Sequence, residues 1–150
     1  MIVSFDLDNT LIPYSNEFEV ENEKLLGKII GAEKIRKGTI KLFHKIEKKN
    51  CEIWIYTTSF RSKLKIKKTF AIYGLRPTKI INGELNNKTL ELKKCKASKN
   101  PNLFGINLHI DDLKGVAEEG EKYKFETLII EPEELNWTEK ILNRIEDLRL

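Results

Sequence analysis

Five short apolar runs, separated by longer amphipathic stretches, constrain the fold of this 150-residue chain more than any other feature. The runs are rich in isoleucine and aromatic residues, as buried β-strands are, and they cover residues 2–5, 52–57, 78–81, 107–110 and 126–130. A periodicity near 3.6 residues predicts helices over residues 32–49, 61–73, 114–123 and 137–148. This alternation indicates an α/β fold, a single doubly wound parallel five-stranded sheet with helices on both faces.

The predicted helices are amphipathic, so their spacing indicates which side chains face the sheet. Gly74 follows the helix over residues 61–73 and can take the left-handed conformation that ends a helix. Residues 14–20 suggest a small hairpin, whereas the polar segment 82–96 shows no clear element. We expect one domain over residues 1–150, with inward-facing side chains at Ile35, Ile40, Phe43, Ile46, Leu64, Phe70, Tyr73, Trp137, Ile141, Ile145 and Leu148.

Lysine gives the chain a net charge of +4, which favours anionic ligands in general. The lysine runs carry no recognised nucleic-acid motif, so we interpret them as solvated faces and expect no specific nucleic-acid binding. No apolar stretch approaches the roughly 20 residues of a membrane span, and the first residues enter a strand pattern directly, so we expect no signal sequence. Cys51 and Cys95 lack metal-ligand spacing and fit thiols in a reducing compartment. We expect a cytoplasmic protein with no membrane contact.

Polar residues follow three of the predicted strands at their carboxyl ends. In a parallel sheet these ends share one edge, where the ligands of open α/β sheets bind. Carboxylates that converge there repel one another, and a hard divalent cation such as Mg²⁺ relieves the repulsion while leaving positions for water and phosphate. The residues at this edge are Asp6 and Asp8 after the first strand, Thr57 and Thr58 after the second, and Asp111 and Asp112 after the fourth.

With these residues in this order, the chain resembles the haloacid dehalogenase (HAD) superfamily of phosphohydrolases, which has four motifs. The first is an apolar strand followed by Asp-x-Asp-x-Thr, and residues 2–10 match it in full. The second, an apolar strand ending in Thr or Ser, resembles residues 53–57, and the fourth, an acidic pair after a strand, resembles residues 109–112. The third is a lysine upstream of the fourth; Lys99 fits by placement, and Lys96 stays open as an alternative.

The resemblance implies hydrolysis of a phosphate monoester with a role for each residue. Asp6 would attack phosphorus and form an aspartyl-phosphate, which water then hydrolyses. Asp8 would act as general acid and then as general base. Thr57 would hydrogen-bond a phosphoryl oxygen, and Lys99 would neutralise its charge. By the same resemblance, Mg²⁺ would bind Asp6, the main-chain carbonyl of Asp8, Asp111 and Asp112. We also expect substrate contacts at Thr10, Thr58 and Tyr14; Tyr14 and Phe18 would line the entrance of an open site, with ordinary hairpin packing as the alternative for these two aromatic residues.

Asp8 also bears on the branch of the superfamily, because the resemblance implies that dehalogenases and phosphonate-cleaving members lack this second aspartate. Many members carry a cap domain over the site, but both intervals that could hold one are short here. We therefore expect no substantial cap domain. An open site predicts a bulky phosphorylated substrate, such as a phosphoprotein, a nucleic-acid end or a conjugated sugar, or else shielding by another subunit of an oligomer.

Other classes of protein must be weighed against a phosphatase. A catalytically weak or inactive HAD-fold protein with a binding or regulatory role would keep the same residues. A phosphoacceptor receiver domain also places acids, Thr and Lys at a sheet edge, but its acidic pair comes first and its phosphorylated aspartate later. In this chain Asp6-x-Asp8 comes first and Asp111-Asp112 comes last. Phosphate-loop hydrolases need Gly-x-x-x-x-Gly-Lys-Ser/Thr, which the sequence lacks.

Overall fold

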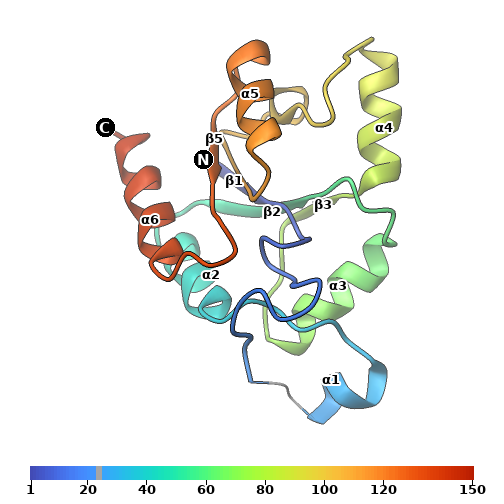
Figure 1. Cartoon of the computed structure of the whole chain (residues 1–150), viewed down its shortest axis with the longest axis vertical. Helices are drawn as coiled ribbons and strands as arrows, with labels where there is room; N and C mark the ends of the chain where they lie inside the picture. Colours follow the sequence, from blue (N-terminus) through green and yellow to red (C-terminus); the bar gives the residue numbers. More distant parts are fainter. Residues whose placement is uncertain (23–24) are drawn as a thin grey trace.

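A fully parallel five-stranded sheet forms the centre of the protein, with the strand order β3-β2-β1-β4-β5 (Figure 1). The computed structural model describes residues 1–22 and 25–150. This sheet confirms the predicted fold class, and each predicted run overlaps one strand. The strands are β1 (Ile2–Phe5), β2 (Glu52–Tyr56), β3 (Lys79–Ile81), β4 (Leu108–Asp111) and β5 (Thr127–Ile129).

The described helices are α1 (Leu25–Ile30), α2 (Thr39–Lys48), α3 (Lys63–Ile72), α4 (Gly83–Leu92), α5 (Lys114–Tyr123), α6 (Trp137–Asp147) and the 3₁₀ helix η1 (Pro101–Phe104). They cover both faces of the sheet, as predicted (Figure 1). In this view α4 and α5 lie above the sheet, and α2 and α3 lie below it. The short α1 lies at the bottom of the view, next to α3.

Two hydrophobic clusters pack against opposite faces of the sheet. In β2, Ile53 and Ile55 belong to the larger cluster, which also holds core residues of α2, α3 and α6. Trp54 and Tyr56 alternate with them and belong to the smaller cluster on the other face. The central strands are thus buried on both sides. Such strands form a rigid base for the polar residues at their carboxyl ends.

The structure corrects several predicted boundaries. The helix predicted over residues 32–49 begins only at Thr39, because Gly38 before it has a left-handed φ of 95°. The polar segment 82–96 holds α4, which Asn82 caps by accepting a hydrogen bond from the amide of Leu85 at 3.3 Å. The hairpin expected at residues 14–20 is wrong, because this segment forms bends and Val20 bridges only to Arg36.

Two of the predicted inward-facing side chains are exposed instead. Leu64 is 61% exposed, because it lies roughly 200° around α3 from the buried Ile66. Leu148 is 39% exposed, since it follows the last residue of α6. The remaining ones are buried or partly buried against the larger cluster. Among the described residues, no helix has the length and apolar character needed to cross a bilayer.

Candidate active site

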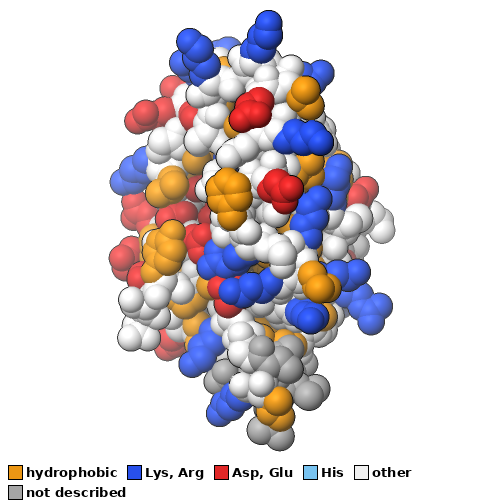
Figure 2. Space-filling view, turned by 90° about the vertical axis from the view of Figure 1, so that its right-hand side faces the viewer, with side chains coloured by type: hydrophobic (Ala, Val, Ile, Leu, Met, Phe, Trp, Pro, Cys, Tyr) orange, Lys and Arg blue, Asp and Glu red, His pale blue; other side chains and the backbone are white. Residues whose placement is uncertain are grey.

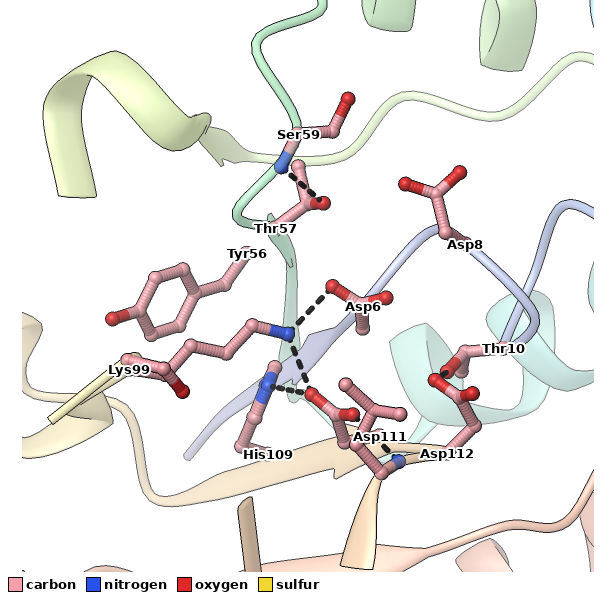
Figure 3. A network of polar contacts seen from close by, with 12 residues as sticks. Asp6, Asp8, Thr10, Tyr56, Thr57, Ser59, Lys99, His109, Asp111 and Asp112 are labelled. Carbon is pink, nitrogen blue, oxygen red and sulfur yellow. Dashed lines mark hydrogen bonds and ion pairs between the residues drawn. The ribbon is translucent and has the colours of Figure 1, made fainter. Parts of the chain in front are cut away.

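The carboxyl ends of β1, β2 and β4 bring three predicted site residues to one edge of the sheet (Figure 3). Asp6 directly follows β1, and its amide donates to the carbonyl of Ile110 at 2.8 Å. Thr57 directly follows β2, and its amide donates to the carbonyl of Ile81 at 2.9 Å. Asp111 is the last residue of β4 and is fully buried. The register of the parallel strands therefore fixes these residues close together, as the sequence predicts.

Lys99 joins the two buried aspartates. Its ammonium lies 2.6 Å from Asp6 Oδ1 and 2.5 Å from Asp111 Oδ2, and the residue is only 2% exposed. The amide of Lys99 donates to the Glu119 carboxylate at 3.2 Å, which ties its loop to α5. Lys96, the alternative from the sequence, is exposed. Lys99 is thus the lysine that the structure brings to Asp6.

Burial and charge set the protonation of this group. Burial raises the pKa of Asp6 to about 7, and the nearby Asp111 adds to this effect although Lys99 opposes it. Burial would also raise the pKa of Asp111, but the hydrogen bond from His109 and the charge of Lys99 hold it well below its usual range. The two carboxylates outweigh the desolvation of Lys99 and raise its pKa, so its ammonium stays charged.

His109 supports Asp111 from inside the sheet, which the sequence analysis did not foresee. Its imidazole lies between the hydroxyl of Ser4, at 2.8 Å, and Asp111 Oδ2, at 3.0 Å, and it is fully buried. Burial lowers the pKa of His109, so the ring is neutral. A neutral ring that donates to Asp111 accepts a hydrogen bond from Ser4 through its other nitrogen. A polar residue within an otherwise apolar strand was the available signal for this role.

Asp6, Asp111 and Asp112 form a cluster that fits a divalent cation. One carboxylate oxygen from each lies within 4.8 Å of the other two. Asp112 is half-buried and accepts a hydrogen bond from the hydroxyl of Thr10 at 3.3 Å. Three carboxylates against one lysine leave excess negative charge, and an all-oxygen donor set suits Mg²⁺. The side chain of Asp8 lies apart from this cluster in Figure 3.

Mg²⁺ is expected to stabilise the protein more at about pH 8 than at about pH 5.5. The folded pKa of Asp6, about 7, lies above its ordinary value of 3.8, so the contribution of Asp6 to stability is full below about pH 4 and is lost as the pH rises through about 7. Mg²⁺ must displace this proton, so it binds more weakly at the lower pH. Thermal denaturation with and without MgCl₂ measures the difference. An equal shift at both pH values would contradict ligation by Asp6.

Asp8 contacts Arg61, a residue that the sequence analysis missed. The guanidinium donates to Asp8 Oδ2 at 2.9 Å through Nη1, and its Nη2 lies 2.8 Å from Oδ1. Its Nε donates to both carboxylate oxygens of Glu33, at 2.8 and 3.1 Å. The hydrogen bond to Asp8 raises the pKa of Arg61, so this cation is permanent. The sequence could have indicated Arg61 through its position in the loop after β2, at the same sheet edge.

The loop after β2 buries Thr57 but leaves Thr58 exposed. The hydroxyl of Thr57 is buried and accepts a hydrogen bond from the amide of Ser59 at 3.1 Å. Thr58 is exposed, and its backbone lies against the start of α4. A Cβ at Gly83 would lie 2.2 Å from the Thr58 carbonyl oxygen, so only glycine allows this close approach. The rigid start of α4 therefore supports the loop that carries Thr57.

The two other predicted substrate contacts differ in exposure. Thr10 is fully buried, and its hydroxyl donates to Asp112, so it orients a member of the carboxylate cluster. Tyr14 is 71% exposed. Desolvation and then the charges of Asp8 and Asp6 raise the pKa of Tyr14. Of these two residues, Tyr14 is thus open to solvent, whereas Thr10 is enclosed beside Asp112.

Comparison with known proteins supports the fold. No family model matches the chain, and no curated protein matches it either. A solved structure, described as a predicted HAD-like family hydrolase from Porphyromonas gingivalis, is similar over 96% of this chain and 97% of that chain. The TM-score is 0.54 and the sequence identity is 13%. At this identity the likeness shows a shared HAD-like fold, and the chemistry must be argued from the residues at the sheet edge.

Proposed function

We propose that this protein is a Mg²⁺-dependent phosphohydrolase that cleaves phosphate monoesters through an aspartyl-phosphate on Asp6. The observation that carries the proposal is the buried ammonium of Lys99, which bridges Asp6 and Asp111 beside Asp112. These residues would serve as a carboxylate nucleophile, a fixed cation and a three-carboxylate metal site at one point. The HAD-like fold is consistent with it.

In the first step, a carboxylate oxygen of Asp6 attacks phosphorus, and the bond from phosphorus to the ester oxygen breaks. Lys99, 2.6 Å from Asp6, and the hydroxyl of Thr57 offer positive charge and a hydrogen bond to the phosphoryl oxygens. Asp8 gives its proton to the leaving oxygen. Asp6, Asp111 and Asp112 would hold Mg²⁺, which would supply further positive charge to the transferring phosphoryl group.

In the second step, water attacks the phosphorus of the aspartyl-phosphate and gives a proton to Asp8. The bond between phosphorus and the Asp6 oxygen breaks, which restores the Asp6 carboxylate and releases inorganic phosphate. His109 and the amide of Leu113, which donates to Asp111 Oδ1 at 2.9 Å, keep Asp111 oriented throughout. The proton on Asp8 is thus returned to its starting place for the next turnover.

The substrate that we propose is bulky. Between β1 and α2, the described residues hold only the six-residue α1 as a helix, and no helical bundle covers the sheet edge. Exposed Tyr14 and Phe60, from the loops after β1 and β2, stand at this edge. A phosphoprotein, a nucleic-acid end or a conjugated sugar would fit such an open site, and a second subunit that shields it is the alternative.

A panel of phosphate esters with Mg²⁺ tests this function. It should span aryl phosphates, small metabolite-like phosphates, phosphopeptides and oligonucleotides with terminal phosphates. We expect phosphate release that stops when EDTA removes the metal, and faster release from at least one bulky class. The oligomeric state should be measured alongside by light scattering. No turnover across the whole panel would favour a binding or regulatory protein that has kept the site residues.

A further inference from the structure

Arg61 holds two carboxylates at once with its whole guanidinium. One side of the planar group, Nη1 and Nη2, meets both oxygens of Asp8 at 2.9 and 2.8 Å. The Nε on the other side meets both oxygens of Glu33 at 2.8 and 3.1 Å. Nη1 also donates to the hydroxyl of Ser59 at 2.8 Å. This geometry fixes the guanidinium, because a fork bound on both sides cannot turn without losing several charge-assisted bonds.

An ordinary surface ion pair does not explain this arrangement. Exposed pairs are weak because water competes for both partners and two side chains lose their freedom. Here the side chains of Arg61, Asp8 and Glu33 are only 19–20% exposed, and all three converge at the catalytic sheet edge. The carbonyl of Arg61 accepts a further hydrogen bond from Asn82, the cap of α4, at 3.1 Å. The backbone of Arg61 is therefore anchored as well as its side chain.

The contacts of Arg61 with Asp8 and Glu33 determine where the Asp8 carboxylate lies relative to Asp6. In the view of Figure 3, Lys99 approaches Asp6 from one side, and Asp8 lies on the other side with its carboxylate directed away from Asp6. Asp8 follows β1 on a short turn, with its neighbour Asn9 at a left-handed φ of 56°. Its side chain contacts the loop after β2 through Arg61. Without this partner, the Asp8 carboxylate would sample several rotamers.

We infer that Arg61 is a positioning residue that holds Asp8 where it can exchange a proton with the leaving group, and that Glu33 fixes Arg61 in turn. This inference rests on the proposed phosphatase function. Glu33 comes from the segment between α1 and α2, so that segment contributes to catalysis without covering the site.

Leaving-group dependence tests the inference. A poor leaving group, such as the alkoxide of an alkyl phosphate, needs the proton from Asp8, whereas 4-nitrophenolate leaves without help. For Arg61→Gln, kcat/KM, which reports on formation of the aspartyl-phosphate, is expected to fall about 10- to 100-fold with an alkyl phosphate, since general acid catalysis supplies about 100- to 10,000-fold. With 4-nitrophenyl phosphate it should fall less than about 3-fold. KM for the alkyl phosphate should change little. Glu33→Gln should show the same pattern more weakly.

Matched variants separate a catalytic effect from a structural one. Arg76 is exposed and precedes β3, at the opposite edge of the sheet, so Arg76→Gln should leave both substrates unaffected. Asp8→Asn should reproduce the leaving-group pattern, and adding Arg61→Gln to it should cause no further loss, because Arg61 acts through Asp8. If Arg61→Gln does not fold, Glu33→Gln provides the same comparison.

Two results would overturn the inference while leaving the proposed function intact. Equal losses in kcat/KM with both substrates would mean that Arg61 maintains the fold, and a large rise in KM alone would mean that it binds the substrate directly. Failure of the proposed function looks different: the wild-type protein would release no phosphate from either ester, or release would be independent of Asp6.

Discussion

The Asp6→Asn variant is expected to lose at least about 10,000-fold in phosphate-ester turnover while it stays folded. An amide cannot form the acyl-phosphate, and among the described residues Asp6 is the carboxylate that contacts Lys99 at the carboxyl end of β1. Asparagine has nearly the same shape as aspartate, so the packing at this 6% exposed position should persist. Steady-state assays with 4-nitrophenyl phosphate and Mg²⁺ measure the loss.

The stability of the same variant gives an independent readout. Because burial raises the pKa of Asp6 to about 7, the charge on Asp6 destabilises the metal-free fold above that pH. Asparagine removes this charge, so the metal-free Asp6→Asn protein should melt at the same temperature as the wild type, or higher, at about pH 8. Asp147→Asn, at the exposed end of α6, is the matched control and should change neither quantity. Mg²⁺-dependent release that survives in Asp6→Asn would rule out Asp6 as the nucleophile.

The sheet was predictable from the sequence because burial on both faces leaves continuous apolar runs. Residues 2–5 were predicted without error as β1, and the other strands begin or end within two residues of their predicted limits. The helix α4 was not predictable in this way. It depends on tertiary contacts, such as the hydrogen bond from Tyr56 to the buried Asn86 at 2.6 Å, and its polar sequence carries no apolar period. Propensity and periodicity contain no information on such contacts.

In the candidate site, too, some residues were predictable from the sequence and others only from the fold. Residues at strand ends, such as Asp6 and Asp111, were predictable because parallel strands carry them to a common edge. Lys99 lies on an irregular loop, and only the fold shows that it, rather than Lys96, reaches Asp6. The pair between Asp8 and Arg61 spans 53 residues of sequence and joins two loops. Nothing in the local pattern of either loop specifies this pairing, which follows from the adjacency of β1 and β2.

Replacement of Lys99 by methionine is expected to lower kcat/KM about 1,000-fold, because a fixed cation near the phosphoryl group supplies about 100- to 1,000-fold and the orientation of Asp6 is lost as well. Lys96→Ala should lose less than about 2-fold, since Lys96 is exposed and Lys99 is 2% exposed between two aspartates. Both variants should be assayed with the same aryl phosphate at saturating Mg²⁺. Equal and mild losses would mean that neither lysine serves the reaction.

The charge balance of the site predicts how Lys99→Met affects stability. Removing one partner of a buried ion pair costs about 3 to 5 kcal/mol, because the remaining charges stay buried without compensation. Lys99 opposes the raised pKa of Asp6, so its loss raises that pKa further and Asp6 takes up a proton more readily. The destabilisation should therefore be largest at about pH 8 in EDTA and should shrink at about pH 5, or when Mg²⁺ is added. Urea denaturation under these three conditions measures it.

A double-mutant cycle makes this argument specific to the contact between Lys99 and Asp6. In Asp6→Asn/Lys99→Met, one carboxylate and the ammonium disappear together, and Asp111 keeps its hydrogen bonds from His109 and from the amide of Leu113. The double variant should thus be more stable than Lys99→Met alone at about pH 8, with a coupling energy of about 1 to 3 kcal/mol. Additive effects would show that the 2.6 Å contact contributes nothing. In that case Lys99 would act on Asp111 alone, and its part in orienting the nucleophile would have to be abandoned.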